Sequence, residues 1–169
     1  MGRPTELTKE WLLEHHIVDI TKDGEVFKKT GSGKIVKLRL YPRTKPTKYA
    51  CKTYYVFSIY DKEERKRQKE AYKEKGTWAA GNKEIVLSRA IWAWWYDGTS
   101  ATIDKVSDGS REFLGGECPP HTAPEGLDID HINDNSLDNN FDNLQLLTRA
   151  ENLAKRKGHR NQHESSLVE

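Results

Sequence analysis

The chain of 169 residues lacks long apolar runs and has almost no cysteine. No stretch approaches the roughly 20 consecutive apolar residues that a membrane-spanning helix needs. The opening residues, MGRPTELTKE, contain no apolar segment of the kind that a secretory signal requires. Cys51 and Cys118 form no CxxC pair, which excludes a disulfide scaffold and a four-cysteine zinc site. We therefore expect a cytoplasmic protein that does not associate with a membrane.

Hydrophobic residues are also few, at 35%, while charged residues reach 32%, so we expect about one domain with a small core. Residues 1–75 hold 19 Lys and Arg against 11 Asp and Glu, residues 76–147 hold 4 against 12, and residues 148–169 hold 5 against 3. A basic front half followed by an acidic stretch indicates a polyanion partner, with a cation site in the acidic part. The alternative is that these charges only solvate the surface.

Acidic residues are missing altogether between Val26 and Tyr60, a window that contains nine Lys and Arg with tyrosines between them. Tyrosine hydroxyls and basic side chains both donate hydrogen bonds to phosphates. This window therefore favours contact with nucleic acid over mere solvation. The residues of the window that we predict to contact DNA are Lys34, Lys37, Arg39, Arg43, Lys45, Lys48 and Lys52.

Alternating apolar and polar residues predict a β-rich front half. The predicted strands cover residues 16–21, 25–29, 34–40, 53–60 and 84–88. An Asp23-Gly24 turn joins the first two. The mixed-charge run at residues 61–75 favours a solvated helix, and residues 89–96 favour a short helix whose tryptophans pack in the core. Residues 98–120, rich in Gly, Ser, Thr and Asp, are typical of a long loop.

The most informative segment covers residues 124–157, PEGLDIDHINDNSLDNNFDNLQLLTRAENLAKRK. Residues 127–130 alternate as a short strand does, a loop dense in Asn and Asp follows, and residues 143–147 return as a second strand. Thr148 with Glu151 three residues later is a capping box, which opens a helix. The segment therefore predicts a strand, a loop, a strand and a helix.

The predicted helix has two different faces. Its apolar face, which we expect to pack on the two strands, consists of Ala150, Leu153 and Ala154. On the other side, the amide oxygen of Asn152 would look back toward Asp130 and His131. Carboxylate and amide oxygens suit Mg²⁺ or Mn²⁺, and a neutral imidazole is the usual base at physiological pH. Lys155 and Arg156 would extend a phosphate-binding stripe beyond this point.

Two other metal sites are weaker interpretations of the region. Residues 134–145 begin with the spacing of a calcium-binding EF-hand loop, but Asn139 stands where that loop needs glycine and Gln145 where it needs glutamate. Cys118-Pro-Pro-His121 has the spacing of half a zinc site, but no second ligand pair is evident. Neither pattern therefore predicts a metal site.

Asp130-His131, Asn143-Leu144 and Asn152 together resemble the motif of the HNH nuclease family, in the branch typical of phage and intron homing endonucleases. In that branch the third letter of the motif is commonly Asn, as it is here. A looser similarity covers residues 85–95, where relatives carry a His-Arg pair and this chain has Ser88-Arg89.

This resemblance implies a ββα-metal fold that hydrolyses phosphodiester bonds of double-stranded DNA with one divalent ion, Mg²⁺ or Mn²⁺, and no small-molecule cofactor. Asp130 and Asn152 would hold the metal, His131 would take a proton from the attacking water, and Asn143 would support the loop. The resemblance also implies a phage or mobile element in a bacterial cell as the source. One motif per chain makes a single cut a nick, so double-strand cleavage would need a homodimer or a second event.

The expected architecture is α+β, with a basic β-rich N-terminal part and a C-terminal ββα-metal motif. Its segments are residues 1–75 for DNA contact, 76–123 for a supporting strand, helix and loop, 124–158 for the nuclease motif, and 159–169 for a tail. Outside the front half, the predicted DNA-binding residues are Arg89, Arg149, Lys155 and Arg156.

Two other functions are compatible with this sequence: a DNA-binding protein that keeps the fold without cleaving, and a nuclease of the toxin or restriction type. The intact Asp130, His131 and Asn152 favour cleavage, because a protein that only binds DNA has no need of all three.

Overall fold

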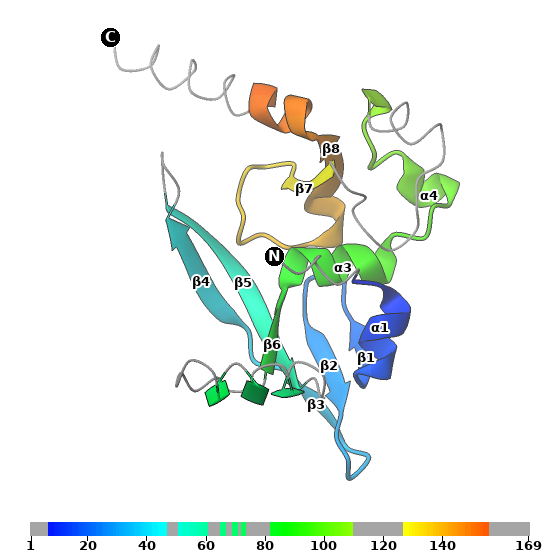
Figure 1. Ribbon diagram of the computed structural model, residues 1–169. Coiled ribbons are helices and arrows are strands. Elements are labelled where there is room, and N and C mark those ends of the chain that lie inside the picture. Colours follow the sequence, from blue (N-terminus) through cyan, green and yellow to red (C-terminus); the bar gives the residue numbers. More distant parts are fainter. Residues whose placement is uncertain are drawn as a thin grey trace.

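The computed structural model describes residues 7–46, 51–60, 65–66, 69–70, 72–73, 82–109 and 127–155, which form an α+β fold (Figure 1). The strands are β1 Ile17–Ile20, β2 Val26–Lys29, β3 Ile35–Lys37, β4 Tyr41–Pro46, β5 Cys51–Tyr60, β6 Asn82–Val86, β7 Leu127–His131 and β8 Leu144–Thr148. The helices are α1 Lys9–Glu14, α3 Leu87–Trp95, α4 Ser100–Ile103, the 3₁₀ helix η1 Phe141–Asn143 and a helix over residues 149–155. None of the described helices has the length and apolar character that crossing a bilayer requires.

The strands form two three-stranded antiparallel sheets and one hairpin. β1, β2 and β3 make the first sheet, β4, β5 and β6 make the second, and β7 pairs with β8. Each strand predicted in the front half is present, with ends shifted by a few residues. The largest difference lies at residues 34–40, where only Ile35–Lys37 is a strand.

β4 is a strand that the sequence pattern does not predict, because Pro42 and Pro46 interrupt it. It is the edge of the second sheet and pairs with β5 from Tyr41 opposite Val56 to Pro46 opposite Cys51. Every residue of β4 is exposed. An edge strand tolerates proline, because its outward backbone groups need no partner in the sheet.

α3 lies at the centre of the hydrophobic core, between the two front sheets and the β7–β8 hairpin (Figure 1). The predicted packing of the tryptophans is confirmed, since Trp92 is fully buried and Trp94 is 9% exposed. The indole nitrogen of Trp95 donates a hydrogen bond to the carbonyl oxygen of Ile20 in β1 at 2.8 Å. The rings of Trp92 and Phe141 lie 6.2 Å apart. One helix thus joins the front half to the segment that carries the predicted motif.

The prediction of a loop over residues 98–120 is wrong at α4. Asp97 lies before the N-cap residue Thr99, and its Oδ1 accepts hydrogen bonds from the backbone of Thr99 at 3.0 Å and from Thr102 Oγ1 at 2.8 Å. These bonds, with that from the Thr99 hydroxyl, lower the pKa of Asp97 to about 2. Residues 110–120 lie outside the described residues. Within the helix predicted at residues 61–75, the described residues 65–66, 69–70 and 72–73 are helical.

The Asp23-Gly24 turn between β1 and β2 packs closely on α3. Gly24 has a φ of +88°, and a Cβ on it would lie 3.3 Å from Ile91 Cδ1 and 3.3 Å from Leu87 Cδ2. Gly33, in the turn between β2 and β3, has a similar φ of +84° but no atom within 4 Å of such a Cβ. A side chain at Gly24 would therefore meet both backbone strain and crowding, whereas one at Gly33 would meet backbone strain alone.

We expect Gly24→Ala to lower the free energy of unfolding by about 2 kcal/mol or more, because it adds backbone strain and overpacks α3. Gly33→Ala should cost about 1 kcal/mol, from backbone strain alone. Urea unfolding of both variants measures the difference. Equal losses would show that α3 accommodates the extra methyl group without cost.

Candidate functional site

The candidate site is built on the β7–β8 hairpin and the helix over residues 149–155, which follow one another along the chain (Figure 1). Both predicted strands are confirmed, and they pair antiparallel with Asp130 opposite Gln145 and His131 opposite Leu144. Leu144 and Leu146 of β8 are buried in the core. The hairpin is therefore anchored in the same hydrophobic cluster as α3.

The predicted capping box at the start of the helix is confirmed, and it has a third member. Glu151 Oε2 accepts hydrogen bonds from the backbone and hydroxyl of Thr148 at 2.7 Å and 2.6 Å, and Glu151 N donates to Thr148 Oγ1 at 3.3 Å. Ser107 Oγ donates to the same carboxylate oxygen at 2.7 Å. Burial would raise the pKa of Glu151, but these hydrogen bonds hold it below its ordinary value. The first helical turn, and Asn152 with it, is thus attached to β8.

Asn143 ties the two ends of the β7–β8 loop together. Its Oδ1 accepts a hydrogen bond from the backbone of Asn133 at 3.1 Å, and its Nδ2 donates to the carbonyl oxygen of Asp138 at 2.8 Å. The loop is also attached to the front half, because Ser136 Oγ donates to the carbonyl oxygen of Thr53 in β5 at 2.6 Å. The loop therefore lies against the β4–β5 hairpin.

His131, at the end of β7, is held in one orientation. The residue is 7% exposed, and its Nε2 lies 3.2 Å from Oδ1 of the buried Asn139. Asn139 Nδ2 donates to the carbonyl oxygen of Leu137 at 3.1 Å, so the amide oxygen must face the ring. An amide oxygen only accepts hydrogen bonds. The neutral ring therefore carries its proton on Nε2, and Nδ1 is the nitrogen with a free electron pair.

Burial lowers the pKa of His131 below its ordinary value, and the positive charge of Lys52 acts in the same direction. The hydrogen bond with Asn139 and the nearby carboxylates oppose this shift without reversing it. The surroundings therefore favour the neutral imidazole that a general base must be. The contact of Asn139 with His131 could not be predicted from the sequence, where Asn139 is one of several loop asparagines.

Asn152 has one end of its amide bonded and the other free. Its Nδ2 donates to Asp128 Oδ2 at 2.8 Å. A carboxylate cannot donate a hydrogen bond at neutral pH, so this contact fixes the orientation of the amide. Oδ1 is buried and has no hydrogen-bond partner among the described residues. The sequence analysis placed Asn152 toward Asp130 and His131 and did not identify Asp128 as its partner.

Asp130 is 8% exposed, and one of its two carboxylate oxygens accepts hydrogen bonds from the protein. Its Oδ2 accepts hydrogen bonds from Gln145 Nε2 at 2.9 Å and from Lys155 Nζ at 2.8 Å. No described residue donates a hydrogen bond to Oδ1. Asp130 Oδ1 and Asn152 Oδ1 are thus two hard oxygen acceptors without protein partners in this part of the chain.

These two oxygens fit a small divalent ion of the Mg²⁺ or Mn²⁺ type. Within the described ranges, no group of three or more His, Cys, Asp or Glu is arranged to hold a metal ion. Mg²⁺ sites need no such group, because this ion usually takes one or two protein carboxylates and completes its shell with water and substrate phosphates. Asp130 and Asn152 would be the protein ligands of such an ion.

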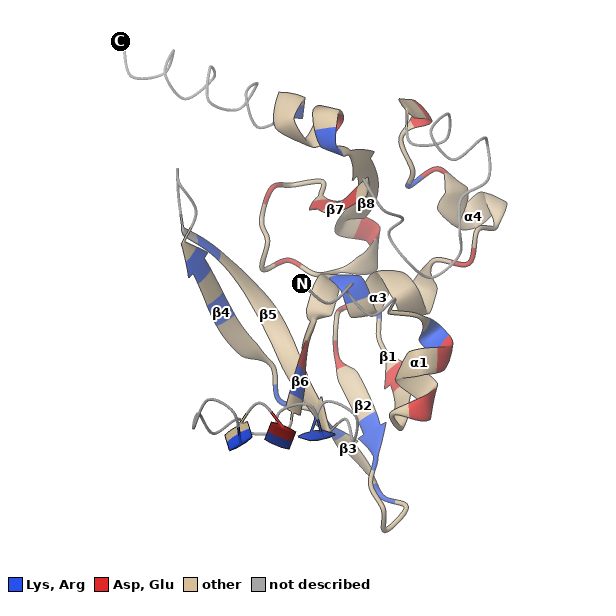
Figure 2. Ribbon diagram, in the orientation of Figure 1, with Lys and Arg blue, Asp and Glu red and all other residues tan. Residues whose placement is uncertain are grey.

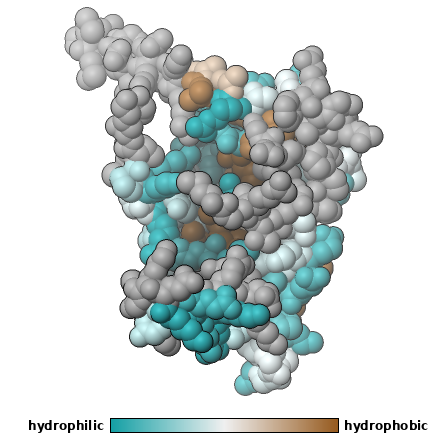
Figure 3. Space-filling view, viewed as in Figure 1, coloured by the Kyte–Doolittle hydropathy of each residue, from teal (hydrophilic) through white to brown (hydrophobic). Residues whose placement is uncertain are grey.

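The prediction for the apolar face of the helix is wrong. Leu153 is 46% exposed, and Ala150 and Ala154 are exposed as well. Apolar brown atoms are accordingly visible at the upper end of the surface in Figure 3, where this helix lies. The face toward β7 instead carries Asn152 and Lys155, because they bond to Asp128 and Asp130 on one face of that strand. Polar pairing, rather than apolar burial, sets the rotation of the helix.

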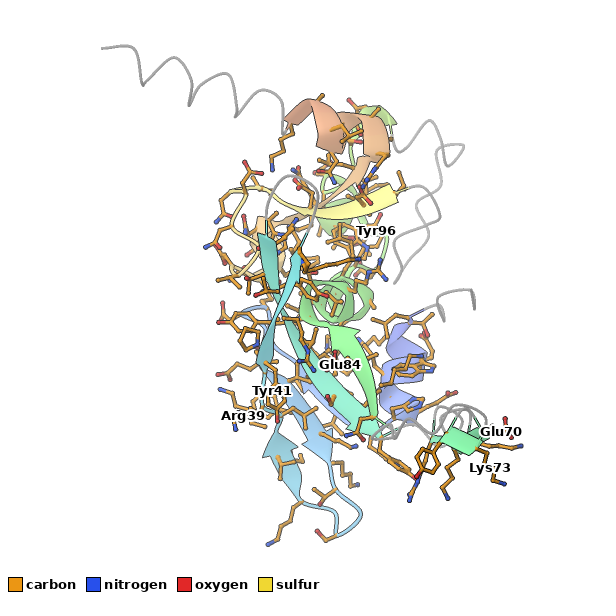
Figure 4. All side chains as sticks on the ribbon, turned by 60° about the vertical axis from the view of Figure 1, so that its left-hand side comes forward. Arg39, Tyr41, Glu70, Lys73, Glu84 and Tyr96 are labelled. Carbon is orange, nitrogen blue, oxygen red and sulfur yellow. The ribbon has the colours of Figure 1, made fainter. Side chains whose placement is uncertain are left out.

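The predicted DNA-binding residues fall into two groups in the structure. Several are in internal contacts: Lys37 forms an ion pair with Glu25, Arg43 with Glu84, Arg149 with Asp128 at 2.9 Å, and Lys155 with Asp130 at 2.8 Å. Arg39 lies over the ring of Tyr41, with its guanidinium carbon 5.3 Å from the ring centre (Figure 4). The hydrogen bonds that Arg43 donates to Glu84 raise the pKa of Arg43 above its ordinary value. Lys37, Arg43 and Arg149 keep more than half of their side chains exposed, and Lys34, Lys45, Lys52 and Arg89, which make up the second group, are exposed as well.

Lys45 and Lys52 lie directly opposite each other on the β4–β5 hairpin. Like charges in opposite positions of a strand pair are unfavourable unless an anion joins them. Figure 2 shows basic residues on β4 and β5, and acidic residues on the β7–β8 loop, which contacts β5 through Ser136. Lys48 and Arg156 lie outside the described residues.

We expect Glu151→Ala to lower the free energy of unfolding by about 1 kcal/mol and to weaken Mn²⁺ binding, because the capping box fixes Asn152. Thr8→Ala is the matched control: Thr8 caps α1 through a hydrogen bond from Trp11 N at 3.1 Å, far along the chain from Asn152. It should cost about as much stability and leave Mn²⁺ binding unchanged. Chemical unfolding and calorimetric titration measure both quantities. A loss of Mn²⁺ binding in both variants would assign the effect to general instability.

Comparison with known proteins agrees with the nature of this site. The sequence model of a family described as HNH endonuclease matches residues 122–154, which include β7, β8, the loop between them and most of the following helix. No curated protein and no solved structure matches the chain. The C-terminal part of the chain is therefore similar to the HNH endonuclease family, and this similarity supports a nuclease activity.

Proposed function

We propose that this chain is a metal-dependent DNA endonuclease of the homing type, which nicks or cuts double-stranded DNA with a preference for its site. The observation that carries the proposal is that Asp130 Oδ1 and Asn152 Oδ1 accept no hydrogen bond from the described residues, while His131, which follows Asp130 in the chain, is held as a neutral ring with its electron pair on Nδ1. A buried oxygen acceptor without a partner is unfavourable in a protein that has no use for it. A divalent ion would give Asn152 Oδ1 the partner that it lacks among the described residues.

The chemistry would divide among these residues as follows. Asp130 and Asn152 would hold one Mg²⁺ or Mn²⁺ ion, which when bound neutralises charge on the scissile phosphate and the leaving oxygen. His131 Nδ1 would accept the proton of the attacking water, because Asn139 keeps the proton of the neutral ring on Nε2. Asn143 would keep the loop closed around these groups.

The β4–β5 hairpin is the part of the front half that we propose to contact DNA next to the cleaved bond. Its strand β5 accepts the hydrogen bond of Ser136 from the β7–β8 loop, and the charge of Lys52 acts on His131. Lys45 and Lys52 form an exposed basic pair on this hairpin. The two positive charges lie opposite each other on an exposed strand pair, so the hairpin is suited to a contact with the phosphate backbone.

A second candidate is a DNA-binding protein that does not cleave. The observation in its favour is the ion pair between Lys155 and Asp130, since an internal cation could replace a metal at that carboxylate. The free oxygen of Asn152 favours the endonuclease, because Lys155 does not contact it among the bonds of the described residues.

We expect the wild-type protein to nick supercoiled plasmid DNA in the presence of Mg²⁺, and His131→Ala to lose about 10²–10⁴-fold of the rate. The His131 variant should still bind Mn²⁺, because the imidazole is not a ligand in this scheme. Asn152→Ala should lose both cleavage and Mn²⁺ binding. Gel analysis of plasmid forms and calorimetry measure the two properties.

Leu153→Ala is the matched control, because Leu153 lies next to Asn152 in the chain and is 46% exposed. It should cleave as the wild type does. DNA binding without any nicking in Mg²⁺ or Mn²⁺ would support the non-cleaving alternative, and unchanged cleavage by His131→Ala would remove His131 from the mechanism.

The double variant Lys45→Ala/Lys52→Ala should bind DNA with a weaker dependence on salt. If both side chains touch phosphates, the slope of log affinity against log salt becomes less steep by about 1.8, or about 0.9 per contact. Fluorescence anisotropy at several salt concentrations, with Ca²⁺ in place of Mg²⁺, measures the slope.

Lys69→Ala/Lys73→Ala removes the same charge from two exposed residues at the opposite end of the molecule, where Figure 4 labels Lys73. This control should keep the wild-type slope. Equal changes in the two double variants would indicate that the basic charge acts only through the overall field of the protein.

A further inference from the structure

The ammonium group of Lys155 lies inside the candidate site, in contact with four oxygen atoms. Its Nζ is 2.8 Å from Asp130 Oδ2 and 2.9 Å from Asp134 Oδ1. It also donates to the carbonyl oxygens of His131 at 2.6 Å and Ile132 at 3.2 Å. The Lys155 side chain is 20% exposed. This is a set of oxygen ligands around a cation, formed entirely by the protein.

The turn after β7 brings these four oxygens to one place. The carbonyl groups of His131 and Ile132 lie at the end of β7, where the chain turns away from the strand, and Asp134 N donates to the same His131 oxygen at 3.0 Å. Asp134 adopts a left-handed φ of +60°, which most residues avoid. The turn thus brings a second carboxylate to the cation that already binds Asp130. Two carboxylates so placed would repel each other without it.

We propose that Lys155 is a built-in cation of this site, which neutralises Asp130 and Asp134 in the metal-free protein and thereby weakens divalent-ion binding to the DNA-free protein. The inference rests on the proposed function, because it takes Asp130 as a metal ligand. Lys155 holds Asp130 Oδ2 and leaves Oδ1 to the ion, so the two cations share one carboxylate. Lys155 is therefore a positioning residue, which sets the orientation of Asp130 and the charge that a metal ion meets.

The test is the affinity of the DNA-free protein for Mn²⁺, measured by calorimetry on wild type and Lys155→Met. Methionine keeps the unbranched side chain as far as Cε and removes the ammonium group with its charge. Since one charge at this range changes a proton affinity by one to three orders of magnitude, we expect Lys155→Met to bind Mn²⁺ about tenfold more tightly or better. Lys155→Arg keeps the charge and should stay near the wild-type affinity. If Lys155→Met does not fold, Lys155→Gln, whose amide still donates to the carbonyl groups, takes its place.

Thermal unfolding gives a second readout that does not involve DNA cleavage. Without metal, Lys155→Met should unfold at a lower temperature than wild type, because its two carboxylates are no longer neutralised. Saturating Mn²⁺ should raise the unfolding temperature of this variant more than that of wild type, since a ligand that binds more tightly stabilises more at equal concentration.

Lys105→Met is the matched control. Lys105 Nζ donates to the carbonyl oxygens of Phe141 at 2.8 Å and Leu144 at 3.3 Å, so it holds the other end of the same loop without touching Asp130. Its removal should lower the unfolding temperature and leave the Mn²⁺ affinity unchanged. An increase in Mn²⁺ affinity in both lysine variants would overturn the proposal, because loosening of the loop, rather than loss of the charge beside Asp130, would then explain it.

Asp130→Ala separates this inference from the proposed function. If Asp130→Ala abolishes Mn²⁺ binding while Lys155→Met binds as wild type does or more weakly, the role of Lys155 is overturned and the nuclease proposal stands. If no variant binds Mn²⁺ at all, or if Asp130→Ala binds it as wild type does, the proposed metal site and the role of Lys155 are both overturned.

Discussion

The burial of α3 is the constraint on which the rest of the structure depends. Trp92 of this helix is fully buried, and Trp95 reaches back to the carbonyl oxygen of Ile20 in the front half. On its other side, the helix packs against Phe141, near the end of the loop that follows His131. Large aromatic side chains contribute much of the apolar area that a small core can bury. The candidate site and the front sheets therefore share one core.

Above this core, polar pairs replace apolar contacts between β7 and the helix over residues 149–155. Asp128 bonds to Asn152, and Asp130 bonds to Lys155, so two positions of one strand face meet two positions of one helix face. Buried polar groups without partners are rare in proteins. The Asn152 Oδ1 atom is buried and has no partner within the described part of the chain, which makes it informative about a ligand.

The basic residues of the front half differ in their partners. The basic residues that the composition marks as a single group divide into some that pair with acidic neighbours, such as Lys37 with Glu25 and Arg43 with Glu84, and an exposed pair on the β4–β5 hairpin. Exposed ion pairs contribute little to stability, so a phosphate can replace the acidic partner at small cost. The β4–β5 hairpin is in direct contact with the candidate site, because Ser136 of the β7–β8 loop donates a hydrogen bond to Thr53 in β5.

The sequence by itself determined the features that depend on neighbours in the chain. Alternation identified the strands that flank the Asp23-Gly24 turn, and the Thr148–Glu151 spacing identified a helix start that the hydrogen bonds confirm. The same local order carried the resemblance to HNH nucleases, which the family match over residues 122–154 supports.

Only the tertiary structure decided the features that depend on residues far apart in the chain. β4 exists because β5 pairs with it in spite of its prolines, and the apolar face of the last helix turns outward because Asp128 and Asp130 bind its polar face. The roles of Asn139 beside His131 and of Lys155 beside Asp130 have the same origin. A short sequence pattern records which side chains can make hydrogen bonds, but the choice of partner is made when distant segments pack and each buried polar group must find one.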